Sequence, residues 1–412
     1  MTADTTADAL SLLSAEAVRV RAHRMLEIGL DSRLRHFRVD LERLGATVDL
    51  VLATTQKAYP TFDVPFHSRW RHFVVGELDR WDALAGATAW RDKTARARAE
   101  FDLAIVSVLL DAGAGASWRY RDSVTGASVG RSEGLALASL DMFARGAFSA
   151  NRDEPLRVDA TALERLTLAD LQDGFQVSEG NPLVGLEGRV GLLRRLGQQV
   201  SALPGIFSRG DAPRPGGLFD HLAAQADKGS IAAATILSEL LRQLGPIWPS
   251  RIALGGIALG DCWRHPDIKT DDATSELVPL HKLSQWLSYS LIEPMQRAGL
   301  DVTDIDGLTG LAEYRNGGLF VDTGVLVLRD PDDMRREHDV ASTLVVEWRA
   351  LTVALLDRLA DVLRQRVGLD PVSLPLAKIL QGGTWAAGRA TAFARRPDGS
   401  PPFKIISDGT VF

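Results

Sequence analysis

Apolar residues recur at three- and four-residue intervals along most of this chain, and that periodicity restricts the fold more than any other feature of the sequence. The spacing is typical of amphipathic helices packed against a core. Strong helix patterns cover residues 7–30, 192–203, 230–244, 280–298 and 342–367. Thr161 and Thr167 each have an acidic residue three positions later, which predicts two further helix starts.

Patterns typical of strands are short and few. Residues 117–122 predict one half of a small hairpin, and residues 319–328 predict another short strand. No internal repeat and no clear linker divides the chain. We therefore expect a mainly α fold with a single large helical domain, in which residues 1–94 form an N-terminal helical layer and residues 95–412 form the main part.

Composition and charge exclude several classes of protein. The chain has 412 residues, of which 45% are hydrophobic, so it can bury a large core without disulfides. Its single cysteine, Cys262, allows neither an intramolecular disulfide nor a thiolate-rich metal site. The net charge of -6 argues against a nucleic-acid partner. With no secretory signal and no stretch of roughly 20 apolar residues, we expect no membrane partner and a cytoplasmic location.

The sequence contains no standard cofactor or metal motif. It has no P-loop, no His-Glu-x-x-His, no nucleophile elbow and no Rossmann glycine fingerprint. The histidines are scattered, and the one close pair, His67 and His72, has a spacing that suits a shared metal on one helix face poorly. We expect neither a cofactor nor a metal.

The first polar cluster lies in residues 65–73, where His67, Arg69 and Arg71 stand among aromatic residues. Either arginine can bind a phosphate, with His67 as a further ligand contact. The alternative is a solvated helix start whose arginines pair with Glu77 and Asp79. Spacing alone does not separate the two interpretations.

The second cluster follows a turn with two glycines and ends at Asp220 and His221. These two side chains can orient a substrate or relay a proton. The alternative is a helix cap after a tight turn.

A third cluster joins Asp261 to the start of a predicted helix that carries Lys282 and Gln285. Lys282 and Gln285 are three residues apart and share one helix face. They either reach into a pocket or extend along the surface.

Two more clusters lie towards the C-terminus. Glu313 ends an apolar stretch and is a candidate catalytic acid or nucleophile; its alternative is a surface pair with Arg315. The small residues around Trp385 allow a backbone to approach a small ligand, although a close helix crossing also uses small residues.

Taken together, these clusters resemble the uracil catabolism protein 4 family. The resemblance rests on residues 65–73, 214–221, 308–315, 382–389 and 407–412, and it spans almost the whole chain. It implies a role in a pyrimidine-degradation route in which the opened uracil ring leaves a ribosyl-urea intermediate.

From about Phe101 onwards the chain is also similar to the queuosine salvage protein family, whose members are queuosine-nucleotide N-glycosylases with a helical, DNA-glycosylase-like fold. That family's Leu-Thr-x-Phe-Ala-Asp-Tyr-Arg motif reads here Leu308-Thr-Gly-Leu-Ala-Glu-Tyr-Arg315, which implies that its catalytic carboxylate corresponds to Glu313. The likeness extends to Lys282 and Gln285 and, loosely, to the segment ending at Asp111.

Near the C-terminus, the family's Leu-Asp-Tyr-Tyr-Leu-Trp-Asp stretch resembles Leu380-Gln-Gly-Gly-Thr-Trp-Ala386. Trp385 is kept, but the two acidic residues that hold the queuine base are replaced by Gln381 and Ala386. This replacement implies a leaving group other than queuine.

Cleavage of a ribosyl C–N bond builds positive charge on the sugar, so a carboxylate such as Glu313 near the anomeric carbon stabilises or attacks that centre. The candidates for activating water or protonating the leaving group are, in order of preference, Asp220, His221, Asp261 and Asp111. Tyr314, Arg315, Trp385, Gln381 and Gln285 are expected substrate contacts, and Lys282 with Arg69 or Arg71 would anchor a 5'-phosphate.

The two resemblances together imply an N-glycosidase that releases urea from ribosyl-urea or its 5'-phosphate, with a small nucleoside or nucleotide as its partner. Two alternatives stay open: an amidohydrolase acting on the ureido group, and a non-catalytic protein that binds a pathway intermediate. The sequence leaves the phosphorylation state of the substrate and the oligomeric state undetermined.

Overall fold

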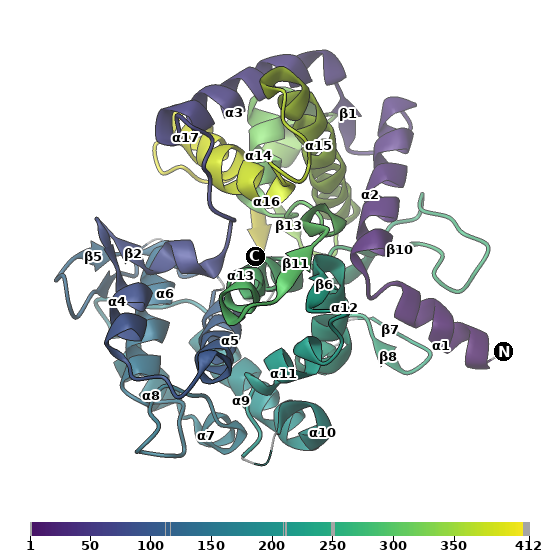
Figure 1. Ribbon diagram of the computed structural model, residues 1–412. Helices are drawn as coiled ribbons and strands as arrows, with labels where there is room; N and C mark the ends of the chain where they lie inside the picture. Colours follow the sequence, from purple (N-terminus) through teal and green to yellow (C-terminus); the bar gives the residue numbers. More distant parts are fainter. Residues whose placement is uncertain are drawn as a thin grey trace. The chain divides into compact units, whose positions relative to one another are not determined.

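The computed structural model describes residues 2–111, 113–115, 117–208, 210, 212–248 and 252–406, and this part of the chain is mainly helical, as expected (Figure 1). Its strands are short and occur as two-stranded pairs. The described residues divide into two compact units, treated separately below. Unit 1 lies within residues 1–67, 250–285 and 304–407, and unit 2 within residues 68–249 and 286–303. The expected boundary after Thr94 falls inside a helix of unit 2.

Unit 1 is built from helices of both chain ends. Its α-helices are α1 (Thr2–Ser11), α2 (Ala15–Leu30), α3 (Leu44–Ala58), α14 (Tyr314–Asp322), α15 (Thr343–Val367), α16 (Leu376–Ile379) and α17 (Trp385–Arg395), together with the start of α13 (Lys282–Ala298) as far as Gln285. A π-helical segment, η6 (Leu380–Thr384), joins α16 to α17. Its strand pairs are β1 (Phe37–Val39) with β12 (Leu326–Leu328), β7 (Ala253–Leu254) with β8 (Ile257–Ala258), β9 (Cys262–Arg264) with β10 (Leu277–Pro279), and β13 (Glu337–Asp339) with β14 (Lys404–Ile406).

Helix α15 is the centre of unit 1. Its Ser342 cap accepts a hydrogen bond from the Val345 amide, and its C-terminal cap Gly368 adopts the left-handed backbone with φ 69°. Nearly every residue of its first four turns is buried, and the helix packs along α2. The short strands lie around this helical core.

Helices α14 and α17 pack against each other because a glycine lets their backbones approach closely. A Cβ atom added at Gly388 in α17 would lie 2.3 Å from the carbonyl oxygen of Arg315 in α14. No larger residue fits there without moving a backbone. This contact fixes the start of α14 next to the start of α17.

Unit 2 is a second helical assembly. Its helices are α4 (Arg80–Ala87), α5 (Lys93–Leu109), α6 (Arg131–Ala144), α7 (Ala160–Arg165), α8 (Leu168–Gly174), α9 (Leu186–Ala202), α10 (Pro204–Phe207), α11 (Gly217–Ala223), α12 (Ala233–Leu244) and α13 from Trp286 onwards. Its strand pairs are β2 (Val74–Val75) with β3 (Leu78–Asp79), β4 (Tyr120–Arg121) with β5 (Ser128–Val129), and β6 (Ser230–Ala232) with β11 (Asp301–Thr303).

Short 3-10 turns complete both units. They are η1 (Leu41–Arg43), η4 (Ile305–Gly307) and η5 (Pro331–Met334) in unit 1, and η2 (Arg69–Phe73) and η3 (Gly245–Ile247) in unit 2.

The hairpin expected over residues 117–122 and the capping box at Thr167 are confirmed. Four details differ. Residues 7–30 form two helices, because Ser14 caps the second one. The strand expected in residues 319–328 is limited to Leu326–Leu328, since α14 occupies the earlier part. Residues 230–232 form a strand rather than a helix, because they pair in parallel with β11. Thr161 lies inside α7 instead of capping it.

The Gly388 contact yields a stability prediction. We expect Gly388→Ala to lower the free energy of unfolding by about 1–3 kcal/mol, because the new methyl group meets backbone rather than a movable side chain. Gly45→Ala in α3 is the matched control, since its Cβ would meet only the end of the Arg366 side chain at 3.3 Å. Chemical denaturation of both variants tests this; equal stability would show that α17 shifts freely.

Candidate active site

Glu313 is the N-terminal cap of α14. Its carboxylate accepts hydrogen bonds from the backbone amides of Arg315 (2.7 Å) and Asn316 (2.6 Å), one on each oxygen. These amides lack partners within the helix, so the carboxylate satisfies them and is held in one orientation. Glu313 is 7% exposed, so the alternative of a surface pair with Arg315 is wrong.

Burial is the largest influence on the charge of Glu313 and raises the pKa of its carboxyl above the usual range. The amide of Arg315 and the positive charge of Lys282 act in the opposite direction. The side chain of Arg315 points elsewhere, because its guanidinium donates to the carbonyl of Gly399 at 2.7 Å and lies 4.7 Å from the Tyr314 ring. The site therefore combines a buried carboxylate, whose ionised form is disfavoured by burial, with a nearby lysine that favours that form.

A buried ion pair between Asp261 and Arg349 holds the starts of two helices. The two side chains form a bidentate contact of 2.7 and 2.8 Å. Asp261 also accepts the Lys282 amide at the start of α13 (2.9 Å), and Arg349 donates to the carbonyl of Ala312, the residue before Glu313 (3.2 Å). Arg349 holds the pKa of Asp261 far below its usual range, against the effect of burial. One pair thus orients both Lys282 and Glu313.

Gln285 fixes the loop that leads to Glu313. It is fully buried, and its amide group donates to the Thr309 hydroxyl (2.8 Å) while accepting from the Thr309 backbone (3.3 Å). Both ends of the amide are engaged within the protein. The structure therefore gives Gln285 a positioning contact rather than a surface role.

The π-helical segment η6 presents Gln381 beside His67. The Oε1 atom of Gln381 accepts a hydrogen bond from His67 Nδ1 at 2.8 Å, and the His67 ring lies 6.0 Å from the ring of Trp385. No described residue accepts a hydrogen bond from the amide nitrogen of Gln381. Gln381 is half-buried, so this donor remains available to a ligand. π-Helical turns are frequent at functional sites.

The arginines of residues 65–73 lie in unit 2 and are already paired there. Arg69 is fully buried and contacts Asp111 at 3.0 Å and the Ser107 hydroxyl at 2.7 Å; Arg71 contacts Glu293 at 2.7 Å. The expected alternative partners Glu77 and Asp79 are therefore wrong. Burial lowers the pKa of Arg69, and Asp111 opposes that effect.

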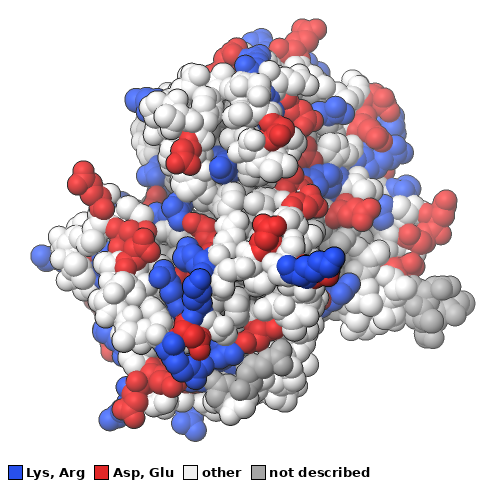
Figure 2. Space-filling view, viewed as in Figure 1, with Lys and Arg blue, Asp and Glu red and all other residues white. Residues whose placement is uncertain are grey.

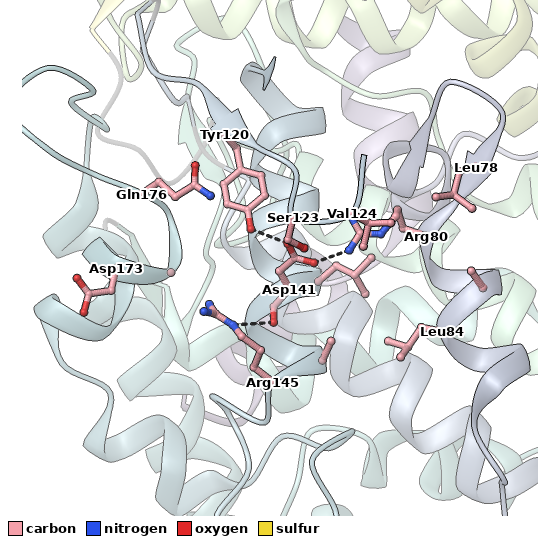
Figure 3. A pocket seen from close by; sticks show the side chains of 14 residues that line it. Leu78, Arg80, Leu84, Tyr120, Ser123, Val124, Asp141, Arg145, Asp173 and Gln176 are labelled. Atoms are coloured by element: carbon pink, nitrogen blue, oxygen red, sulfur yellow. Dashed lines mark hydrogen bonds and ion pairs between the residues drawn. The ribbon is translucent and has the colours of Figure 1, made fainter. Parts of the chain in front are cut away.

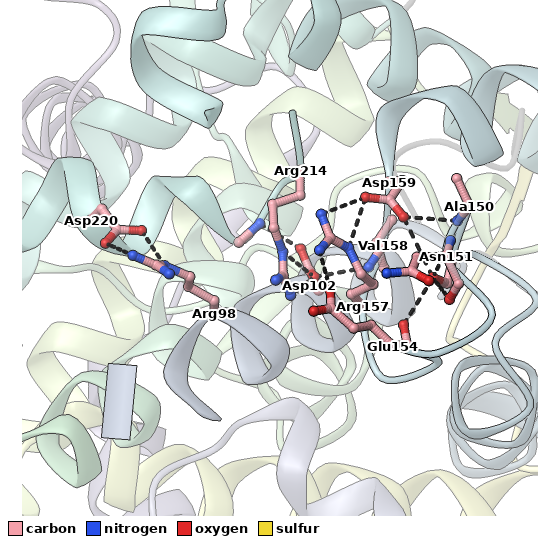
Figure 4. Close-up of polar contacts among 12 residues, drawn as sticks. Arg98, Asp102, Ala150, Asn151, Glu154, Arg157, Val158, Asp159, Arg214 and Asp220 are labelled. Carbon is pink, nitrogen blue, oxygen red and sulfur yellow. Dashed lines mark hydrogen bonds and ion pairs between the residues drawn. The ribbon is translucent and has the colours of Figure 1, made fainter. Parts of the chain in front are cut away.

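Asp220 and His221 lie inside α11, so the alternative of a helix cap is wrong for both. Asp220 forms a bidentate ion pair with Arg98 of α5, at 2.7 and 2.6 Å (Figure 4). His221 has a different partner, because its Nε2 lies 2.7 Å from Glu239 of α12. Although they are adjacent in sequence, Asp220 and His221 thus contact different partners.

A second buried pair lies close to α11 in the same unit. Asp102 accepts from the Arg214 guanidinium and from the amides of Gly216 (2.5 Å) and Val158 (2.9 Å) (Figure 4). It fixes the glycine turn that precedes α11. The glycines of this turn therefore serve close packing, since a Cβ at Gly216 would lie 2.3 Å from the Arg98 carbonyl.

The helix pattern of residues 342–367 did not predict a buried charge, yet Arg349 is 1% exposed. Helical spacing could have indicated this burial. Arg349 is four residues after Val345 and three before Thr352, and both of these residues are buried on the same face of the helix. A charge at that position indicates an internal partner.

Acidic and basic side chains are interspersed over most of the face shown in Figure 2. In the described part of the chain, no helix combines the length and apolar character needed to span a bilayer. Within the same residues, no three His, Cys, Asp or Glu side chains are grouped as metal ligands would be.

Comparison with known proteins places the chain in a family. A family model described as "Protein of unknown function (DUF1688)" matches residues 11–412. "Protein urg3" of Schizosaccharomyces pombe (strain 972 / ATCC 24843) is 40% identical over 97% of this chain and 98% of its own length. "Uracil catabolism protein 4" of Lachancea kluyveri is 37% identical over 93% of each chain. The chain therefore belongs to the DUF1688 family, which its resemblance to uracil catabolism protein 4 had indicated.

Proposed function

We propose that this protein acts in uracil catabolism as an N-glycosidase that hydrolyses ribosyl-urea or its 5'-phosphate. Water adds to the anomeric carbon, the C–N bond breaks, and the products are urea and ribose or ribose 5-phosphate. The name of the relative from Lachancea kluyveri supports the pathway. The observation that carries the reaction is the buried carboxylate of Glu313, held by two backbone amides.

A buried carboxylate suits this reaction because charge interactions strengthen as water is excluded. As the C–N bond breaks, the sugar becomes an oxocarbenium-like cation, which an adjacent carboxylate stabilises. Each oxygen of Glu313 accepts only one amide hydrogen bond and retains a further lone pair. The cap therefore orients the carboxylate and leaves part of its capacity to accept hydrogen bonds unused.

Gln381 is proposed to recognise the urea group. Its Oε1 is occupied by His67, so its amide nitrogen carries the remaining donors. Those donors match the carbonyl oxygen of urea, on which negative charge builds as the leaving group departs. His67 is a positioning residue in this proposal, because it fixes which end of the amide faces a ligand.

If the substrate carries a 5'-phosphate, Lys282 is its first proposed anchor, because its charge acts on Glu313. Arg71, whose side chain is 26% exposed, is more accessible than the fully buried Arg69. Within unit 2, His221 is hydrogen-bonded to Glu239, whereas both carboxylate oxygens of Asp220 are occupied by Arg98. Asp111 is likewise occupied, by Arg69.

The first test removes the charge of Glu313. We expect Glu313→Gln to fold and to reduce urea release from ribosyl-urea or its 5'-phosphate by roughly 10²–10⁴-fold, the range typical of a positioned catalytic group. Glu27→Gln, an exposed glutamate in α2, is the matched control and should retain wild-type turnover. Near-wild-type activity of Glu313→Gln would remove Glu313 from the mechanism. Tight binding without any turnover by the wild type would favour a binding protein.

The second test uses pH. If ionised Glu313 is the active form, kcat/KM should fall as the pH drops through its raised pKa, above the range of an exposed glutamate. Lys282→Met removes a charge that lowers this pKa, so the acid limb should move to higher pH, whereas Lys282→Arg should leave it in place. pH–rate profiles of the three proteins provide the measurement. An unchanged limb in Lys282→Met would contradict the assignment of that limb to Glu313.

The third test is a double-mutant cycle on His67 and Gln381. We expect Gln381→Leu to lower kcat/KM by about 10–100-fold, and His67→Ala to lower it less. If His67 acts through Gln381, adding His67→Ala to Gln381→Leu should cause no further loss. Additive losses would show that His67 has a separate role.

A further inference from the structure

Unit 2 contains a pocket that the proposed reaction does not use. Its volume is about 560 Å³, within the range of small-molecule sites (Figure 3). It is formed by α4, the β4 turn, the end of α6 and the end of α8. One wall is apolar and consists of Leu78, Ala83, Leu84, Val124 and Leu140.

The buried polar side chains of this pocket are held by one another, with Arg80 shared between two carboxylates. Asp141 accepts hydrogen bonds from Arg80 (2.6 Å), Tyr120 (2.7 Å) and Ser123 (2.6 Å), as the dashed lines in Figure 3 show in part. Arg80 also pairs with Asp122. Burial and Asp141 raise the pKa of Tyr120, so its hydroxyl stays protonated as a donor. This network forms a rigid wall, since each side chain is held by another.

Two further charges of the pocket are not neutralised. The Nε of Arg145 donates to the Asp141 carbonyl at 3.2 Å, and its two terminal nitrogens form no hydrogen bond or ion pair with another described residue. Asp173, which also lines the pocket (Figure 3), has no ion-pair partner in the described chain. Both side chains are exposed, and both also line a neighbouring pocket of about 410 Å³. The pocket thus presents one cation and one anion beside an apolar wall.

We propose that this pocket binds a free α-amino acid with an apolar side chain. The carboxylate of the ligand would pair with the terminal nitrogens of Arg145, whose fork matches carboxylate geometry. Its ammonium group would pair with Asp173, and its side chain would contact the wall that contains Leu84 and Leu140. A ligand of this class carries one group to match each of these three features of the pocket.

Other ligand classes fit less well. A phosphate or dicarboxylate would bring a second negative charge towards Asp173 and Asp141. A simple carboxylic acid would leave Asp173 unpaired, and a simple amine would leave Arg145 unpaired. The opposite charges on the same pocket therefore favour a zwitterion.

The test compares three ligands of one shape on the full-length protein by titration calorimetry: leucine, isocaproate (leucine without its amino group) and isoamylamine (leucine without its carboxylate). Leucine should bind at least about tenfold more tightly than either analogue, since each charged contact contributes about one factor of ten. Arg145→Gln should reduce leucine to the affinity of isoamylamine. Asp173→Asn should reduce it to that of isocaproate.

Arg165→Gln is the control, because Arg165 lines only the neighbouring pocket. It should leave leucine binding unchanged, and a loss there would assign the ligand to the other pocket and overturn the proposal. Absence of leucine binding at millimolar concentration would also overturn it, as would equal affinity for leucine and isocaproate. Thermal unfolding of each variant should match the wild type, since both substituted side chains are exposed.

Discussion

The buried pair of Asp261 and Arg349 determines the geometry on which the candidate active site depends. It links the amide of Lys282 to the carbonyl of Ala312, and so connects the starts of α13 and α14 through two side chains. Burying two charges is unfavourable unless their hydrogen bonds are satisfied. Here Asp261 accepts four polar contacts, including the indole of Trp263 at 2.6 Å. The net effect is precise placement rather than large stabilisation.

That placement explains an unusual cap. Asn, Asp, Ser and Thr are the preferred residues at helix N-termini, because their short side chains reach the free amides easily. Glu313 performs the same task with one more methylene, in a buried position that raises its pKa. A shorter residue would cap α14 with less desolvation, so stability alone does not account for a glutamate here. The proposed N-glycosidase reaction would use this buried carboxylate near a developing cation, a role that an aspartate at the same position could also fill.

Part of the fold and of the candidate site could be predicted from the sequence. There are physical reasons why the other features could not. Periodicity located most long helices, and motif resemblance pointed to Glu313, Gln381 and Trp385. Periodicity cannot show that residues 230–232 pair with residues 301–303, because that pairing depends on a distant segment. Nor does spacing reveal the π-helical turn that turns Gln381 towards His67. Arg349 was missed because a charge on a long helix is more often solvated than buried.

Polar residues that look alike in the sequence differ in the structure in how many of their hydrogen-bond donors and acceptors remain unpaired. Asp220 stood in a rich cluster, but both of its carboxylate oxygens are engaged by Arg98 within unit 2. Gln381 and Arg145 retain donors that the described protein does not satisfy. A polar group that is already paired must break that contact before it binds a ligand, whereas a group with unsatisfied donors gains its full hydrogen-bond energy. Ligand recognition is therefore expected first where folding has left donors and acceptors unpaired on an accessible surface.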